Sequence, residues 1–168
     1  MGWLKLLDTP DVLRDKDGVP VEWTVLRLGA NSMTREGEDW TFELDEEQMQ
    51  NILAYFDKKG EDIPLDSEHY LYELAQKKKM DEAEVLKTFP GGMAAMGYGS
   101  LFRLEDKLRV RVRWTPLAYE FLKEKAYKYF SPVIRGFKKG VLRITSVTMT
   151  NEPAFNDLDA LVASANRK

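Results

Sequence analysis

The chain has 168 residues, which fits one domain with a substantial core and leaves little room for two. Hydrophobic residues make up 43% and charged residues 32% of the sequence, a composition too apolar for a disordered chain. The formal net charge of −3 provides no overall cationic field, so nucleic-acid binding is disfavoured. We therefore expect a single folded domain over residues 1–168.

Cysteine is absent, which excludes disulfides, thiolate metal sites and a cysteine nucleophile. No segment approaches the roughly 18 consecutive apolar residues that are typical of a membrane span. Lys5, Asp8 and Asp11 interrupt the region where a signal peptide would carry its apolar core. These features predict a cytoplasmic protein without a membrane partner.

The first elements are predicted to be two strands and a helix. In residues 21–33, Val21 and Trp23 alternate with polar residues, a period of two that is typical of a half-buried strand, and residues 40–44 repeat the pattern. Asp45 and Gln48 have the spacing of a capping box, which predicts that a helix begins there. Lys58, Lys59 and Gly60 are expected to end that helix.

The middle of the chain is expected to hold a short strand and a lysine-rich helical stretch. Pro64 excludes a helix interior, and the alternation over residues 62–69 indicates a strand that leads to His69, the single histidine of the chain. Residues 70–89 are interpreted as a helix followed by a loop.

Residues 93–113 predict a hairpin, with a polar turn at 105–107 and strict alternation after it. Thr115 followed by Pro116 is a strong helix start. The apolar face of that helix is expected to consist of Leu117, Phe121 and Leu122.

Residues 127–134 and 141–150 are predicted strands on either side of a turn at 136–140, and residues 151–154 are predicted to open a terminal helix. The element order lacks regular βαβ alternation. It indicates an α+β fold in which most strands are antiparallel.

His69 is the first candidate for chemistry. A lone histidine is more often structural, but the carboxylates of Asp66 and Glu68 lie beside it and could support an imidazole that acts as a general base. The same three residues could instead bind a metal ion. Because neighbouring residues of a strand project to opposite faces, convergence on a metal is the less favoured interpretation.

Ser131 is the second candidate. Tyr127, Tyr129 and Phe130 precede it, and Pro132 fixes the backbone immediately after it. The alternative is an edge strand in which Pro132 only limits further pairing.

Four motifs occur in order, and together they resemble the Mu-like phage protease family over roughly residues 23–163. They are D-x-E-H at residues 66–69, a glycine-led hairpin that ends in Trp114 and Thr115, Y-x-Y-x-S-P-V at 127–133, and V-T-M-T-N-E-P-A at 147–154. The family is similar to tailed-phage prohead proteases and herpesvirus assemblins. The resemblance implies a closed β-barrel surrounded by helices.

By the same resemblance, Ser131 is the nucleophile and His69 its general base, with no metal or organic cofactor. The third catalytic position falls on Ser146, where relatives carry a histidine or an acid. Ser146 could orient the imidazole but could not balance its charge, so Asp66 or Glu68 remain alternatives.

An oxyanion site is also implied by the resemblance and by a physical argument. Asn151 or Glu152 as a cap, with Pro153 in the first turn, would leave free backbone N–H groups at Ala154 and Phe155. Simple capping of a helix is the alternative.

The implied function is a serine endopeptidase that matures the phage procapsid inside the bacterial cytoplasm. Its expected substrates and partners are scaffold protein, its own extension and the major capsid protein, and it is expected to form a homodimer or a larger assembly. A scaffold extension would follow Lys168. The alternative is a catalytically inactive scaffold- or capsid-binding module with the same fold, which the uncharged Ser146 favours.

Overall fold

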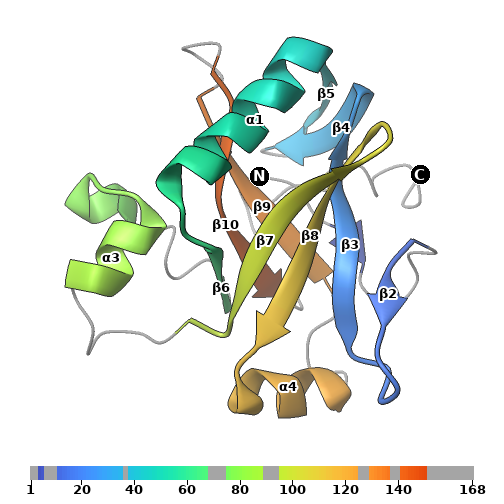
Figure 1. Cartoon of the computed structure of the whole chain (residues 1–168), viewed down its shortest axis with the longest axis vertical. Coiled ribbons are helices and arrows are strands. Elements are labelled where there is room, and N and C mark those ends of the chain that lie inside the picture. The colour runs from blue at the N-terminus through green and yellow to red at the C-terminus, as the bar shows by residue number, and fades with distance from the viewer. Residues whose placement is uncertain are drawn as a thin grey trace.

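The computed structural model describes residues 4–5, 11–35, 38–67, 75–88, 95–124, 129–136 and 141–150. Ten strands are found in these ranges: β1 (Leu4–Lys5), β2 (Leu13–Arg14), β3 (Pro20–Arg27), β4 (Gly29–Arg35), β5 (Glu38–Leu44), β6 (Ile63–Ser67), β7 (Gly97–Leu104), β8 (Lys107–Trp114), β9 (Tyr129–Arg135) and β10 (Arg143–Thr150). Eight of them form one sheet in the order β1-β9-β10-β6-β7-β8-β3-β2, and β4 pairs with β5 in a separate hairpin (Figure 1).

The helices are α1 (Glu46–Lys59), α3 (Glu82–Thr88) and α4 (Pro116–Lys123), with a further helical stretch at residues 75–78. The capping box predicted at the start of α1 is confirmed, because the Asp45 carboxylate accepts from the Gln48 N–H and the Gln48 side chain accepts from the Asp45 N–H. Gly60 ends α1 in the left-handed conformation, at φ 67°. None of the helices in the described ranges is long and apolar enough to cross a membrane.

The fold is α+β and mostly β, but the expected closed barrel is wrong. The sheet is mixed, since β6 and β10 run parallel while the other pairs are antiparallel. Its outermost strands are β1 and β2, and no pairing among the described residues joins the two ends. The sheet nevertheless curls strongly, as shown by Trp23 on β3, which packs against Phe130 on β9 with ring centroids 4.7 Å apart. β3 and β9 are therefore held together by side-chain packing and not by backbone hydrogen bonds.

The concave side of this curl holds the core. Trp23, Leu65, Val110 and Phe130 are essentially inaccessible to solvent there, and Trp114 stacks on Trp23 at 6.2 Å. A Cβ added to Gly99 would lie 2.7 Å from a methyl group of Val110, so a larger residue at 99 would push β7 off the core.

α4 begins as predicted, with the Thr115 hydroxyl accepting from the Ala118 N–H and Pro116 in the first turn. Its expected apolar face is wrong in part. Leu117 and Phe121 are 69% and 40% exposed, whereas Ala118 and Leu122 are buried. A two-turn helix presents only one i, i+4 stripe to the sheet, and here that stripe contains Ala118 and Leu122.

Candidate functional site

Three neighbouring strands bring the described candidate positions into one row. In the β9–β10 ladder Ser131 lies opposite Thr148, and in the β10–β6 ladder Thr148 lies opposite Asp66. Neighbouring strands are about 4.8 Å apart, so the backbones of Ser131 and Asp66 are separated by roughly 10 Å. We call these residues the Ser131–Thr148–Asp66 row.

The parallel pairing of β6 with β10 creates this row. Val147 and Met149 alternate with Thr148 on β10 and are fully buried on the core side of the sheet. Thr148 therefore faces the outer side, where it is nonetheless 0% exposed, and Asp66 is 1% exposed. The outer side of these strands is a buried polar environment, and α1 and α3 both pack on β10.

Ser146 precedes Thr148 by two residues and so shares its face of β10. The residue is 1% exposed, and its Oγ has no hydrogen-bond partner among the described residues. Leaving a buried hydroxyl unsatisfied costs about 1–3 kcal/mol, so such groups call for an explanation. The structure thus brings Ser146 next to the row, as a diagonal neighbour of Ser131.

Asp66 contributes the carboxylate of the row. Its position in the sequence is consistent with either a metal ligand or an acid that orients the imidazole. No group of three or more His, Cys, Asp or Glu residues that could hold a metal occurs in the described part of the chain. A carboxylate can balance the charge of an imidazolium, which a serine hydroxyl cannot do.

The remaining predicted site residues lie outside the described residues. They are Glu68, His69, Ala154 and Phe155. The structure describes the backbone of Ser131, as part of β9. Pro132 pairs with Val147 of β10, and on the other side of β9 the described residues of β1 pair with Tyr129 and Phe130. Among the described residues, Pro132 therefore has a partner strand on one side alone, as expected if the proline limits further pairing of β9.

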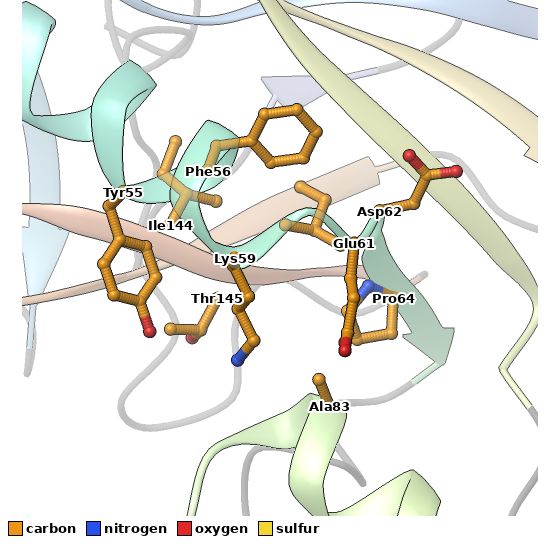
Figure 2. A pocket seen from close by; sticks show the side chains of 10 residues that line it. Tyr55, Phe56, Lys59, Glu61, Asp62, Pro64, Ala83, Ile144 and Thr145 are labelled. Carbon is orange, nitrogen blue, oxygen red and sulfur yellow. The ribbon is translucent and has the colours of Figure 1, made fainter.

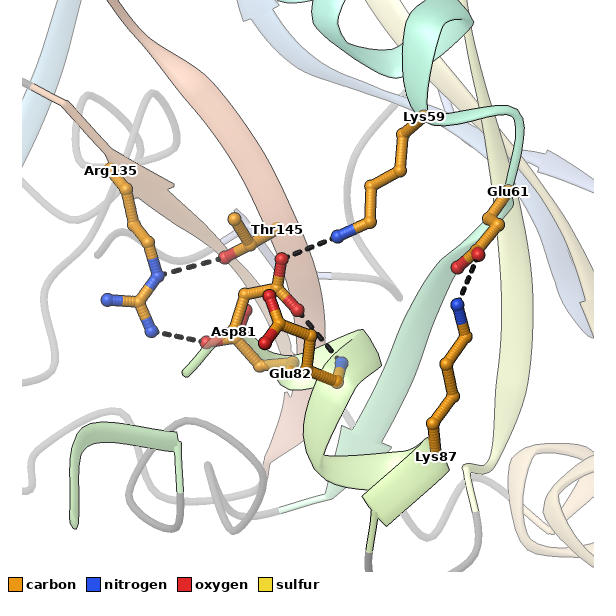
Figure 3. A network of polar contacts seen from close by, with 8 residues as sticks. Lys59, Glu61, Asp81, Glu82, Lys87, Arg135 and Thr145 are labelled. Carbon is orange, nitrogen blue, oxygen red and sulfur yellow. Dashed lines mark hydrogen bonds and ion pairs between the residues drawn. The ribbon is translucent and has the colours of Figure 1, made fainter. Parts of the chain in front are cut away.

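Ion pairs attach α3 to the sheet close to the row (Figure 3). Glu82, which is 0% exposed, accepts a hydrogen bond of 2.5 Å from Arg135 of β9, and Arg135 also donates to the Thr145 hydroxyl at 3.3 Å. Lys59 at the end of α1 donates to Asp81 at 2.5 Å. These contacts hold α1, α3, β9 and β10 together.

The Lys59–Asp81 pair shifts both groups toward their charged forms. Burial acts to raise the pKa of Asp81, but the hydrogen bonds from Lys59 and from the Glu84 N–H outweigh it and lower that pKa below 3.8. Burial acts to lower the pKa of Lys59, and the hydrogen bond and charge of Asp81 raise it above 10.5 instead. Both groups are therefore ionised at neutral pH.

This network was not predictable from the sequence. Residues 70–89 were predicted to form a helix and a loop, and no local pattern links Glu82 to Arg135, which follows it by more than fifty positions. The available signal was the pair of acidic residues Asp81 and Glu82 at the start of the second helical stretch, which is also an ordinary helix-capping pattern.

A narrow crevice of about 10 Å³ lies between α1, α3 and β10 (Figure 2). Tyr55, Phe56 and Ile144 are among its apolar lining residues. Its charged groups are already paired, Lys59 with Asp81, Glu61 with Lys87 and Asp62 with Arg113. We interpret the crevice as a packing feature, since it has room for about one water molecule.

The fold and the row define a class: an α+β domain with a curled, mixed sheet that carries buried hydroxyl and carboxylate groups on the outer side of β10 and β6. A family model described as Mu-like prophage I protein, N-terminal domain, matches residues 23–162. The chain belongs to this phage-related family. No curated protein and no solved structure matches it.

Proposed function

We propose that the chain is a serine endopeptidase of phage procapsid maturation, with Ser131 as nucleophile and His69 as general base. The main support for the proposal is the Ser131–Thr148–Asp66 row. β9, which contains Ser131, and β6, which ends two residues before His69, both pair with β10. Membership of a Mu-like prophage family supports the phage context.

The covalent reach of the chain supports a role for His69. Three peptide units separate it from Asp66, so its Cα lies within about 11 Å of the Cα of Asp66. That distance is similar to the roughly 10 Å between the backbones of Asp66 and Ser131. The length of chain between Asp66 and position 69 is therefore sufficient for the approach of His69 to Ser131 that the proposal requires.

The proposed chemistry has two stages. Ser131 Oγ bonds to the scissile carbonyl carbon while its proton passes to His69, and the C–N bond then breaks as His69 returns that proton to the leaving amine. Water hydrolyses the acyl-enzyme by the same proton transfers. Backbone N–H groups of Ala154 and Phe155 are proposed to bind the oxyanion, because a helix start presents free donors.

For the third member, we favour Asp66 over Ser146. Asp66 is buried in the row and can carry the negative charge that stabilises an imidazolium. Ser146 offers an unpartnered hydroxyl and can only add a hydrogen bond. Replacing Asp66 by Asn should lower kcat by about 10²- to 10⁴-fold, because it removes the charge and retains the shape.

The proposed substrates are the scaffold protein, the chain's own extension and the major capsid protein. Proteolysis would take place inside the assembling procapsid in the bacterial cytoplasm. Self-association as a dimer or larger assembly is part of the proposal, since packing the protease into a procapsid raises its local concentration.

The decisive experiment uses a precursor that carries the natural scaffold. The wild-type protein should process it, whereas Ser131→Ala and His69→Ala should each lose roughly 10³- to 10⁶-fold in rate. Thr41→Ala is the matched control: Thr41 is exposed on β5, in the separate β4–β5 hairpin, and its replacement should leave the rate unchanged. Equal processing by wild type and Ser131→Ala would contradict the proposal.

The second candidate is an inactive scaffold- or capsid-binding module, which the uncharged Ser146 at the third position favours. It predicts that the wild-type protein binds the scaffold precursor and leaves it intact. Chelator treatment provides a further control, because a metal-dependent hydrolase would lose activity with chelator and retain it in Ser131→Ala.

A further inference from the structure

An open cleft lies on the same outer side of the sheet, between α3 and the strands β6, β7 and β8. It has a volume of about 610 Å³ and is lined by Pro64, Tyr98 and Arg113, together with Glu61, Asp62 and Lys87. It shares a boundary with the narrow crevice of Figure 2 at Glu61, Asp62 and Pro64.

The strand register places this cleft next to the candidate site. Pro64 lies opposite Tyr98 of β7, and Tyr98 lies opposite Arg113 of β8. Pro64 precedes Asp66 by two residues on β6, so this second row runs beside the Ser131–Thr148–Asp66 row at a spacing of about 7 Å. From β8 to β9 the sheet spans four strand spacings, roughly 19 Å, which an extended segment of about six residues can cover.

The cleft presents its positive charges to solvent. The side chains of Arg113 and Lys87 are 78% and 64% exposed, whereas their partners Asp62 and Glu61 are 27% and 38% exposed. Arg111, which is 66% exposed and paired to Glu22, lies two residues before Arg113 on β8. The two cations and two carboxylates of the lining balance in charge, and the cations are the outermost of these groups.

Tyr98 adds an apolar contact to the cleft, since it is 41% exposed. The carboxylates of Asp62 and Glu61 lie beneath the cations and can accept hydrogen bonds from a polypeptide backbone. A continuous phosphate backbone has no donors to offer them. The combination of exposed cations, an aromatic ring and recessed acceptors therefore suits an extended acidic peptide better than a nucleic acid.

We propose that this cleft binds an acidic segment of the polypeptide substrate, with substrate carboxylates paired to Arg113 and Lys87 and an apolar side chain packed on Tyr98. As a substrate-docking site, the cleft rests on the endopeptidase function proposed above. It selects substrates by charge at a distance from the scissile bond, so it contributes to binding and takes no part in the chemical step.

Binding is measured by fluorescence anisotropy with Ser131→Ala protein, so that no probe is cleaved. The probe is a labelled peptide of alternating Glu and Leu, compared with the same peptide carrying Lys for Glu and with a single-stranded oligonucleotide of equal charge. The acidic peptide should bind at least tenfold more tightly than the lysine peptide. Its affinity should fall as salt rises, because the contacts are solvent-exposed.

Substitutions then locate the site. Arg113→Gln and Lys87→Gln should each raise Kd by about two- to fivefold, and the double variant by roughly tenfold, as expected for exposed ion pairs. Arg103→Gln is the matched control, since Arg103 is ion-paired to Glu46 outside the cleft. In the precursor assay the double variant should raise KM for an acidic substrate and leave kcat unchanged.

The inference is overturned if the lysine peptide or the oligonucleotide binds as tightly as the acidic peptide, or if the double variant binds like Arg103→Gln. These outcomes are separable from those of the proposed function. Selective acidic-peptide binding without precursor cleavage by the wild type would retain the cleft and reject the endopeptidase. Cleavage without selective binding would retain the endopeptidase and reject the cleft.

Discussion

One sheet carries two different environments on its outer side. We call β9, β10 and β6 the buried half; the outward residues Ser146 and Thr148 of β10 and Asp66 of β6 are at most 1% exposed. On β7 and β8, the open half, Tyr98 and Arg113 are largely exposed. Both halves have alternating strands over the same core. The difference shows that the elements packed on the outer side of the sheet, more than the alternation of residues along its strands, decide where polar side chains are buried.

The ion pairs of the two halves make the contrast quantitative. Arg135 and Glu82 have side chains 19% and 0% exposed, whereas Arg113 and Asp62 have 78% and 27%. Removing one partner of a buried pair leaves an uncompensated charge, while an exposed partner is readily hydrated. An arginine–carboxylate pair therefore has a structural role in the buried half, whereas in the open half such a pair can take part in recognition.

The largest effect on stability is expected where the two ends of the sheet meet. Trp23 contacts both Phe130 and Trp114, so Trp23→Ala should lower the free energy of unfolding by about 3–5 kcal/mol. Urea denaturation measures this. A loss below about 1 kcal/mol would mean that the Trp23–Phe130 contact does not hold the curl together.

The next effect separates the two halves directly. Arg135→Leu should cost about 3 kcal/mol because it leaves Glu82 buried without its cation, whereas Arg113→Leu should cost about 0–1 kcal/mol. The double variant Arg135→Leu with Glu82→Leu should recover much of the loss. Equal costs for the two single variants would remove the distinction between the halves.

A smaller effect is expected from pH. The pKa of Asp81 lies below its usual 3.8 because of Lys59, so its contribution to stability is full above pH 3.8 and is lost as pH falls through the folded-state pKa. The pKa of Lys59 lies above 10.5, so its contribution is lost only as pH rises through that higher value.

Thermal unfolding between pH 5 and pH 2 tests this linkage. In Asp81→Asn the melting temperature should fall less steeply between pH 5 and pH 2 than in the wild type. Glu46→Gln is the control, because Arg103 holds the pKa of Glu46 at about 2 on an exposed surface, where salt should screen the effect. An equally steep fall in Asp81→Asn would show that the Lys59–Asp81 pair does not stabilise the fold.

The smallest stability effect is expected at Ser146. Its hydroxyl has no partner among the described residues, so Ser146→Ala should raise the free energy of unfolding by about 1 kcal/mol, because the substitution removes a buried polar group that forms no hydrogen bond there. In the proposed mechanism kcat should fall less than tenfold, against the larger loss for Asp66→Asn. A larger kcat loss in Ser146→Ala than in Asp66→Asn would assign the orienting role to Ser146.

Features that depend on neighbouring residues were predictable from the sequence. The capping box of Asp45 and Gln48 and the Thr115 cap with Pro116 were predicted and are confirmed. The β7–β8 hairpin was predicted as well, and its turn contains Glu105 at φ 56°. Each of these depends on contacts a few positions apart, so local chemistry is sufficient. The roles of Ser131 and His69 came from motif order and stay predictions.

Only the tertiary structure decided the parallel pairing of β6 with β10, which places Asp66 beside Thr148. Periodicity indicates which face of a strand is apolar, but it does not say which distant strand lies next to it. The closed barrel, which was expected from the family resemblance, was wrong. Burial behaves in the same way: Leu117 is exposed and Glu82 is fully buried because of what packs around them. The sequence by itself determined the elements and their caps, whereas the curl, the row and the cleft result from packing between segments far apart in the chain.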